Sequence, residues 1–250
     1  MQVARVGSTE WLYVDSKTAG AALVMLPGAI GTCEMFYKVF AALRAELRVV
    51  SVTYPAESDP EALADGLADF MDELGLSRAS LVGSSFGGFW AQFFALRYPD
   101  RVETLFLGNT FVEPSELFAK NPLFAPETVF NTPPERLQRL WREVVERTPA
   151  SELRSLQLAM LSGRQSAVNL YARFVGVAEA LPCPELRVAD SSIAVIDCDD
   201  DPIIPRATRV AVRERFPGAT VYTLGTGGHY PHVLNPARYV EAIRTQLKAA

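Results

Sequence analysis

Short apolar runs alternate with segments of helical periodicity through the first 110 residues, and the alternation resumes after residue 190. The apolar runs predict strands over residues 11–14, 22–26, 48–52, 79–83, 102–107, 192–196 and 221–224. Apolar spacing of three to four residues predicts helices over residues 36–47, 60–74, 86–98, 206–215 and 235–250, the second opening with an Asp-Pro start signal at positions 59 and 60. The run 22–26 is apolar throughout, which is typical of a strand buried on both faces of a parallel sheet. This order of elements predicts an α/β fold with a mostly parallel, doubly wound sheet.

The segment from residue 113 to residue 180 interrupts this alternation. It contains no run typical of a strand, only helical patterns separated by prolines. Over residues 135–147, Arg and Glu recur at four-residue spacing, which is typical of a solvated helix face. We therefore predict that residues 1–112 and 181–250 form the main domain. Residues 113–180 are predicted to form a helical cap, or lid, inserted between two strands and placed over the carboxyl edge of the sheet.

Composition and charge limit the classes of partner. With 250 residues, 49% of them hydrophobic and 21% charged, the chain is long enough to bury a full core. The net charge is −5 and no Lys/Arg cluster occurs, so neither nucleic acid nor an anionic membrane is an expected partner. The most apolar run, residues 19–30, is too short to span a bilayer and is interrupted by Pro27. The N-terminal residues lack the apolar core of a signal peptide, so we expect a soluble, cytoplasmic protein.

Cysteines and histidines are few. Cys33, Cys183 and Cys198 are an odd number at no metal-ligand spacing, which favours a reducing compartment over a disulfide framework. The chain has 2 histidines, His229 and His232, so a histidine-rich metal site is not expected. We predict neither a metal nor a cofactor.

The pentapeptide Gly83-Ser84-Ser85-Phe86-Gly87 follows the apolar run 79–83 and directly precedes the helical pattern 86–98. This G-x-S-x-G pattern between a strand and a helix predicts a nucleophile elbow, a sharp turn that exposes one serine hydroxyl above the sheet. Ser85 holds the central position, whereas Ser84 is out of frame. Glycines are needed on either side because strand and helix cross closely there. The competing interpretation is an ordinary Gly/Ser turn.

A serine hydroxyl needs a base to become a nucleophile, and the base needs an orienting acid. In folds with this elbow the chain order is serine, acid, histidine. Asp201 is the predicted acid because it lies in the loop after the strand at residues 192–196 and before a helix; Asp200 is the main alternative, and Asp197 and Asp199 are interpreted as solvated loop charges. His229 is the predicted base because it follows two glycines after the last strand. His232, beside Pro231, is interpreted as a loop or surface histidine.

Two backbone N–H groups should stabilise the oxyanion of an attacked carbonyl. Phe86 follows the nucleophile and Ala29 lies in the turn after the strand 22–26, so we predict that these two residues form the oxyanion hole. An apolar acyl pocket is predicted from aromatic residues near the elbow and in the cap; the candidates are Phe86, Phe89, Trp90, Phe111, Phe118, Phe124, Trp141, Tyr171 and Phe174. Packing in the core is the competing interpretation of these aromatic residues.

These motifs together resemble the α/β-hydrolase superfamily and, within it, the maspardin group. The matching segments are 26–32 (LPGAIGT), 54–55 (YP), 83–92 (GSSFGGFWAQ) and 226–231 (TGGHYP), which span most of the catalytic domain. The resemblance implies an α/β-hydrolase fold. The maspardin group is regarded as one of non-catalytic binding proteins that lack the acid and the histidine. This chain departs from that pattern by having Asp201 and His229 at the corresponding positions, which favours a working enzyme.

The sequence thus predicts a serine hydrolase that cleaves a small ester or thioester through Ser85, Asp201 and His229. Two alternatives stay open. One is a non-catalytic protein that binds a ligand or partner in the same pocket. The other is a C–C bond hydrolase or perhydrolase that uses the same three residues, since fold alone does not decide chemistry. The expected partner is a small-molecule acyl substrate, and a homodimer is left open.

Overall fold

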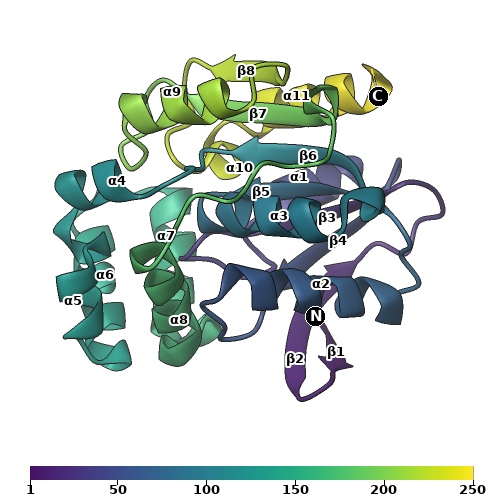
Figure 1. Ribbon diagram of the computed structural model, residues 1–250. Helices are drawn as coiled ribbons and strands as arrows, with labels where there is room; N and C mark the ends of the chain where they lie inside the picture. The colour runs from purple at the N-terminus through teal and green to yellow at the C-terminus, as the bar shows by residue number, and fades with distance from the viewer. Residues whose placement is uncertain (250) are drawn as a thin grey trace.

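The computed structural model describes residues 1–249 and contains a sheet of strand order β1-β2-β4-β3-β5-β6-β7-β8 (Figure 1). The strands are β1 Gln2–Val6, β2 Thr9–Asp15, β3 Ala22–Leu26, β4 Arg48–Thr53, β5 Ala79–Ser84, β6 Val102–Gly108, β7 Ile193–Cys198 and β8 Thr220–Leu224. β1 pairs with β2 and β2 pairs with β4 in antiparallel fashion, whereas every other pair is parallel. The predicted mostly parallel, doubly wound sheet is confirmed.

Helices cover both faces of the sheet. One core layer packs under α2 (Pro60–Glu73), α3 (Phe86–Arg97) and α9 (Arg206–Arg215), and the other packs under α1 (Tyr37–Leu43) and α11 (Pro236–Ala249) (Figure 1). This double cover explains why β3 is buried at every position. At the start of α2, the Asp59 side chain accepts a hydrogen bond from the N–H of Glu61 at 3.0 Å, so the predicted helix start is confirmed.

The register of the central strands places two loops side by side. Leu26 of β3 lies opposite Gly83 of β5, and Gly83 in turn lies opposite Leu107 of β6. Because these strands are parallel, their carboxyl ends meet at one edge of the sheet. The turn that begins at Pro27 therefore lies beside the turn that contains Ser85.

Helices fill the chain between β6 and β7 and gather at one side of the molecule (Figure 1). They are α4 (Ser115–Lys120), α5 (Pro126–Phe130), α6 (Pro134–Glu146), α7 (Glu152–Ala159) and α8 (Ala167–Ala178), and a kinked helical segment (Met160–Arg164) joins the last two. The rings of Phe124, Trp141 and Phe174 pack with centroids 5.0–5.4 Å apart. This aromatic cluster joins the segment before α5 to α6 and α8.

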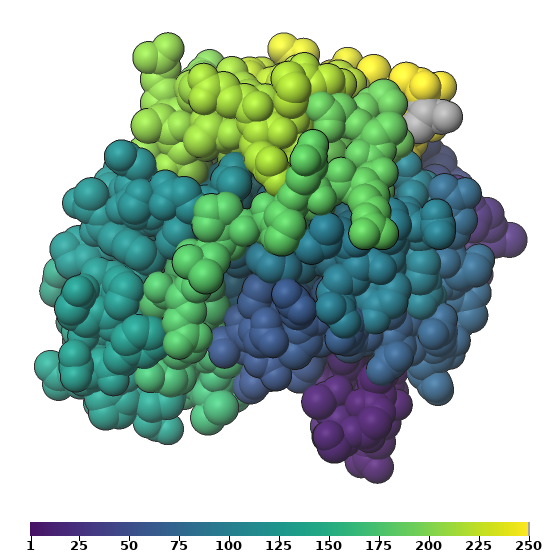
Figure 2. Space-filling model, viewed as in Figure 1, coloured from purple at the N-terminus to yellow at the C-terminus, as the bar shows by residue number. Residues whose placement is uncertain are grey.

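The structure differs from the sequence-based prediction at two places. β1 was not predicted; it forms a hairpin with β2 that projects from the body of the molecule (Figure 2). Only Ala4 of β1 is buried, so the strand carries almost no apolar signal. α1 ends at Leu43 instead of continuing to residue 47, because turns at 44–46 lead directly into β4. Among residues 1–249, the helices are all too short or too polar to cross a bilayer.

Candidate active site

Ser85 occupies a strained turn between β5 and α3. Its backbone has φ 53° and ψ −123°, a region that residues other than glycine rarely adopt. The turn is held from both sides, since the Ser85 N–H donates to the carbonyl of Gly108 at 2.8 Å and its own carbonyl accepts from the Thr110 hydroxyl at 2.6 Å. Backbone strain that surrounding bonds maintain in this way is typical of functional sites.

Close crossing of backbone explains the glycines around Ser85. A Cβ on Gly83 would lie 2.5 Å from the Cα of Gly88, and one on Gly87 would collide with the carbonyl of Leu26. A Cβ on Gly28 would lie 3.0 Å from the Cβ of Ser85. The loop after β3 therefore touches the Ser85 side chain directly, and larger residues at these positions would push the two turns apart.

His229 and Asp201 form a buried pair at the carboxyl edge of the sheet. Nδ1 of His229 lies 3.0 Å from Oδ2 of Asp201. The other oxygen of Asp201 accepts from the N–H groups of Ile203 at 2.7 Å and Ile204 at 2.9 Å. Burial by itself would raise the pKa of Asp201, but the charge and hydrogen bond of His229, with the two N–H bonds, hold this pKa below its usual range. Asp201 is thus a carboxylate at neutral pH with one oxygen directed at the imidazole.

The neighbouring carboxylates have other partners. Asp197 is buried in β7 and pairs with Arg213 at 2.6 Å, so its interpretation as a solvated loop charge is wrong. Asp199 is exposed, 3.6 Å from the Arg209 guanidinium. Asp200 accepts from the N–H groups of Gly227 at 3.2 Å and Gly228 at 2.8 Å. Asp200 therefore braces the glycine turn that leads to His229, while Asp201 contacts the imidazole itself.

A cavity of about 440 Å³ brings Ser85 and His229 together. Its lining is mostly apolar and comes from the loop after β3, the elbow, the helices before β7 and the loops after β7 and β8; the residues are Gly28, Ala29, Ile30, Ser84, Ser85, Phe124, Trp141, Val144, Val145, Thr148, Pro149, Ser151, Leu153, Arg154, Gln157, Phe174, Pro202, Ile203, Gly228, His229, Tyr230 and Leu234. Within residues 1–249, no hydrogen bond joins Ser85 Oγ to His229. In free enzymes this bond is often long and tightens only when substrate binds.

The predicted oxyanion donors belong to the two turns that meet at Ser85. Ala29 lines the cavity, and Phe86 is the first residue of α3 with its ring fully buried. Neither backbone N–H has an intramolecular acceptor in the part of the chain that the structure describes, residues 1–249. Unpaired N–H groups beside a reactive serine are suited to hold a developing negative charge.

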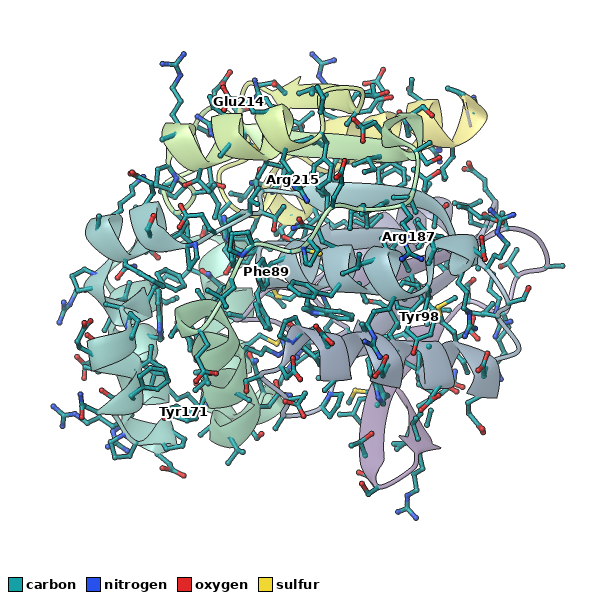
Figure 3. All side chains as sticks on the ribbon, in the orientation of Figure 1. Phe89, Tyr98, Tyr171, Arg187, Glu214 and Arg215 are labelled. Carbon is teal, nitrogen blue, oxygen red and sulfur yellow. The ribbon has the colours of Figure 1, made fainter. Side chains whose placement is uncertain are left out.

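Six of the nine aromatic residues predicted for the acyl pocket do not line this cavity. Three of them, Phe89, Trp90 and Phe111, are completely buried in the core (Phe89 is labelled in Figure 3). The ring of Phe89 stacks on that of Phe111 with centroids 4.9 Å apart, and Trp90 meets Tyr54 edge-on at 5.2 Å. Because α3 is buried on all sides, its aromatic residues pack into the core, and their assignment to the acyl pocket is corrected. Phe124, Trp141 and Phe174 do line the cavity, whereas Phe86, Phe118 and Tyr171 do not.

Sequence reasoning missed lining residues on α6, α7 and the loop after β8. Val144, Arg154, Gln157 and Tyr230 all contribute to the cavity wall. The charge pairs of α6 indicated a solvated face, but no local pattern shows which apolar side chains a distant loop will meet. Burial raises the pKa of Tyr230 to about 12, so this phenol beside His229 stays neutral.

His232 is buried in the short helix α10 (Pro231–Leu234), which corrects its interpretation as a loop or surface residue. Its ring packs against that of Phe36 with centroids 4.5 Å apart, and its Nδ1 has no hydrogen-bond partner among the described residues. His232 does not line the cavity that contains Ser85. Its burial therefore bears on stability rather than on the site.

Acid should weaken the fold through His232. Burial, with a smaller contribution from His229, lowers the pKa of His232 to about 3, whereas a histidine in an unfolded chain has a pKa of about 6.5. Between these values the unfolded chain binds a proton that the folded chain does not, so the free energy of unfolding should decrease as the pH falls through this window. In urea melts at a series of pH values, His232→Gln should reduce the proton uptake on unfolding by up to one proton. An unchanged pH dependence in the variant would assign that uptake to other groups.

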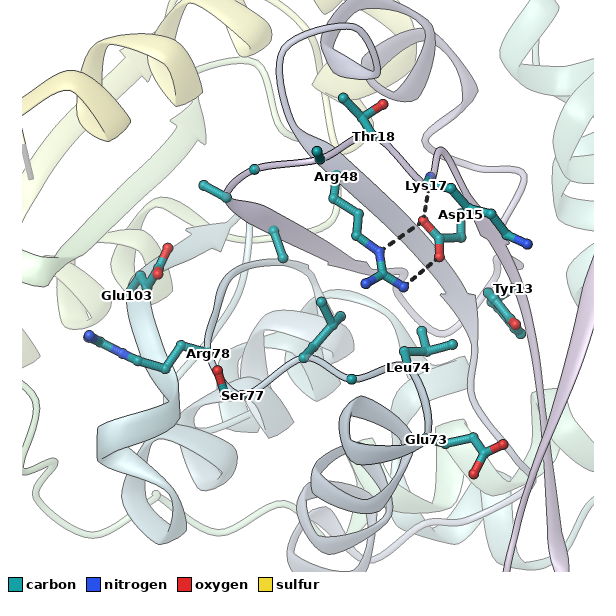
Figure 4. Close-up of a pocket in the computed structure, with 16 residues that line it drawn as sticks. Tyr13, Asp15, Lys17, Thr18, Arg48, Glu73, Leu74, Ser77, Arg78 and Glu103 are labelled. Carbon is teal, nitrogen blue, oxygen red and sulfur yellow. Dashed lines mark hydrogen bonds and ion pairs between the residues drawn. The ribbon is translucent and has the colours of Figure 1, made fainter.

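A second hollow lies at the opposite edge of the sheet (Figure 4). It has a volume of about 730 Å³ and is lined by residues at the amino ends of β3, β4 and β5. Two charged residues of its lining pair with each other, because Arg48 donates hydrogen bonds to both oxygens of Asp15 at 2.8 and 3.3 Å. It contains no serine or cysteine beside a histidine among the described residues, so the cavity at Ser85 is the candidate active site.

Comparisons with known proteins show the family of this chain. The protein-family model described as "Alpha/beta hydrolase family" matches residues 23–242 of this chain. Maspardin from Danio rerio is 25% identical over 249 residues, which cover 96% of this chain and 79% of that protein. A 2-hydroxy-6-oxononadienedioate/2-hydroxy-6-oxononatrienedioate hydrolase from Burkholderia vietnamiensis is 29% identical over 243 residues, covering 87% of this chain and 84% of the relative.

Solved structures show the same fold. A thermophilic esterase from Thermogutta terrifontis superposes with a TM-score of 0.80 at 23% identity, covering 100% of this chain and 99% of the esterase. The enol-lactonase from Burkholderia xenovorans superposes with a TM-score of 0.78 at 20% identity, covering 99% of this chain and 100% of the lactonase.

Proposed function

Because the chain belongs to the alpha/beta hydrolase family, with a likeness to maspardin, we propose that it is a serine hydrolase of small esters or thioesters. One observation carries the proposal: a strained serine and a buried histidine–aspartate pair line or adjoin the same apolar cavity. Ser85 is the nucleophile, His229 the base and Asp201 the acid that orients it. A non-catalytic binding protein would have no need for all three together.

The first half of the reaction forms an acyl-enzyme. Ser85 Oγ attacks the substrate carbonyl carbon while Nε2 of His229 accepts the hydroxyl proton. The carbonyl oxygen becomes negatively charged, and the N–H groups of Ala29 and Phe86 donate hydrogen bonds to it. When the tetrahedral adduct collapses, the bond to the alcohol or thiol breaks and His229 gives its proton to the leaving group.

The second half regenerates the free serine. Water attacks the acyl carbon, His229 accepts its proton, and the acid product leaves as the proton returns to Ser85. Asp201 holds Nδ1 of His229 at 3.0 Å, so Nε2 faces the reacting atoms and the transient imidazolium is stabilised. The lowered pKa of Asp201 keeps this carboxylate ionised throughout the cycle.

The lining of the cavity favours an apolar acyl group over a polar one. Phe124, Trp141 and Phe174 form one apolar wall, and Val144, Val145 and Leu153 extend it. Most of this wall comes from residues 113–180, which we propose act as the cap that selects the substrate. A cavity of about 440 Å³ lies within the range of small-ligand sites.

Hydrolysis of a C–C bond is the second candidate. It is favoured by the 29% identity to the 2-hydroxy-6-oxononadienedioate/2-hydroxy-6-oxononatrienedioate hydrolase, a match that covers most of both chains. The same serine, histidine and aspartate would act on a ketone instead of an ester. The third candidate is a binding protein like the maspardin group, which would bind a ligand in the cavity without turning it over.

Labelling and turnover distinguish these candidates. Wild-type protein should react with a fluorophosphonate probe at Ser85 and hydrolyse a series of p-nitrophenyl esters. A binding protein would show neither. A C–C hydrolase would be labelled but would turn over a vinylogous 1,5-diketone much faster than any ester in the series.

Trimming the aromatic wall should change acyl preference. Trp141→Ala enlarges the cavity without touching Ser85 or His229, so the preferred acyl chain should lengthen while the fluorophosphonate labelling rate changes little. The ester series measured as kcat/KM against chain length checks this. Phe118→Ala, a nearby residue outside the cavity lining, is the control and should leave the profile unchanged. An unaltered profile for Trp141→Ala would remove this residue from the acyl pocket.

A further inference from the structure

Arg173 of α8 is a completely buried cation, and no carboxylate pairs with it among residues 1–249. Its Nη1 donates to two backbone carbonyls of the loop after β3, that of Gly28 at 2.8 Å and that of Gly31 at 2.6 Å. The guanidinium lies over the ring of Tyr54, 3.7 Å from the centroid. Its Nε and Nη2 are buried without a partner among the described residues.

A buried cation without a counter-charge lowers the stability of the fold. Removing a cation from water without a counter-charge carries a large desolvation penalty, and stacking on an aromatic ring offsets only part of this penalty. Burial correspondingly lowers the pKa of Arg173 from its ordinary value. An apolar side chain of similar length would fill the same space at lower cost, so packing does not account for a guanidinium here.

Other side chains hold the same loop. Gln165 donates to the carbonyl of Ala29 at 2.8 Å and accepts from the N–H of Gly31 at 3.0 Å. The hydroxyl of Tyr54 donates to the carbonyl of Pro27 at 2.9 Å. The carbonyls of Pro27, Gly28, Ala29 and Gly31 therefore each accept a hydrogen bond from a side chain.

The Gly28–Ala29 peptide links Arg173 to the site. A trans peptide directs its C=O and N–H to opposite sides, and the chain has no cis peptide among the described residues. Arg173 does not line the cavity, whereas Ala29 does. With the Gly28 carbonyl bound to Arg173, the Ala29 N–H must point the other way, toward the cavity.

We propose that Arg173 is a positioning residue for the oxyanion hole, holding the Gly28–Ala29 peptide so that the Ala29 N–H faces the substrate. The inference rests on the proposed hydrolase function. Without Arg173 the Gly28 carbonyl can rotate toward the cavity, because glycine tolerates either orientation of the following peptide. The lone pair of the Gly28 carbonyl would then face the developing anion in place of the Ala29 N–H donor. The cation also polarises the peptide and strengthens the Ala29 N–H as a donor.

The test compares Arg173→Met, Arg173→Lys and wild type with p-nitrophenyl butyrate and with an alkyl trifluoromethyl ketone, which forms a tetrahedral adduct at the serine. Arg173→Met should lower kcat/KM by on the order of 10- to 100-fold and weaken binding of the ketone by a similar factor. Binding of the matching unreactive alcohol should change less than about threefold, since the acyl pocket is intact. Arg173→Lys, which keeps the charge and one donor, should recover part of both losses.

Arg101→Met is the matched control. Arg101 donates to the carbonyls of Ala68, Leu76 and Ser77, in α2 and in the loop before β5, and it also pairs with Asp72 at 2.7 Å. It does not line the cavity at Ser85, so this variant loses carbonyl bonds and an ion pair without affecting the site. Melting temperatures and circular dichroism of all variants identify losses that follow from unfolding.

The outcomes separate this inference from the proposed function. A wild type that is neither labelled nor active overturns the function and the inference with it. An active wild type whose Arg173→Met form is folded and retains both kcat/KM and ketone affinity overturns the inference alone. Equal weakening of ketone binding and alcohol binding would also contradict the inference, because the loss would then lie in the acyl pocket and not in the oxyanion hole. If Arg173→Met does not fold, Arg173→Lys decides by the same comparison.

Discussion

Replacing Ser85 with alanine should reduce ester hydrolysis by on the order of 10³-fold or more while leaving the protein folded. The hydroxyl is the group that attacks, and the oxyanion donors alone sustain only a residual rate. Ser85 Oγ makes no hydrogen bond within residues 1–249, so its loss removes chemistry and little stability. Initial rates with p-nitrophenyl esters, together with fluorophosphonate labelling and a thermal melt, measure this.

Ser84→Ala is the control for that variant. Ser84 precedes Ser85 and also lines the cavity, yet it belongs to β5 and not to the elbow position. It should retain labelling and most of the activity. If purified Ser85→Ala were labelled and active at the wild-type rate, Ser85 would not be the nucleophile, and the proposed mechanism would be wrong.

Asp201→Asn should have the second largest effect, a loss on the order of 10⁴-fold in kcat/KM if this triad behaves as one in a serine protease does. The amide that replaces Oδ2 holds His229 in a tautomer with its proton at Nε2, where it cannot accept the serine proton. Because the pairing with His229 and the two backbone N–H bonds hold its pKa low against the opposing effect of burial, Asp201 also stabilises the fold above about pH 4 and less as the pH falls further. Kinetics at neutral pH, with melts at neutral and acid pH, check both effects.

Asp200→Asn is the matched variant in the same loop. One oxygen of Asp200 accepts from the N–H of Gly227 and the other from that of Gly228, and an asparagine oxygen can keep one of these bonds. Neither bond involves the imidazole, so the loss should be much smaller. This comparison decides between the two carboxylates that the sequence left open. The reverse order of damage would assign the acid to Asp200 and would mean that the pairing of Asp201 with His229 is not the productive one.

Several elements were predictable because their signals are local. The apolar runs at residues 22–26 and the helical pattern at 206–215 match β3 and α9 at both ends. The elbow pattern contains its own steric reason, since Gly83 and Gly87 are needed wherever strand and helix cross this closely. The end of α1 was less predictable, because apolar spacing continues beyond Leu43 into turns that only the neighbouring strand requires.

Side chains whose surroundings come from distant segments were not predictable. Phe89 and Trp141 are both large aromatic residues, yet the first packs beneath the cavity and the second lines it. His232 lies three residues from His229 and is buried against Phe36, a contact that no spacing indicates. The buried Arg173 has no sequence signal either, since its partners are carbonyls of a loop more than a hundred residues earlier in the chain.

The sequence by itself determined the order of strands and helices, the elbow and the short set of polar residues that chemistry requires, because these depend on periodicity, glycine and chain order. The tertiary structure alone decided which of four neighbouring aspartates meets His229, which aromatic residues form the cavity wall and which side chains hold the loop after β3. Those outcomes depend on how strand register and helix packing bring distant segments together. That information is not present in any local stretch of residues, because burial and hydrogen-bond partners are properties of the assembled layers.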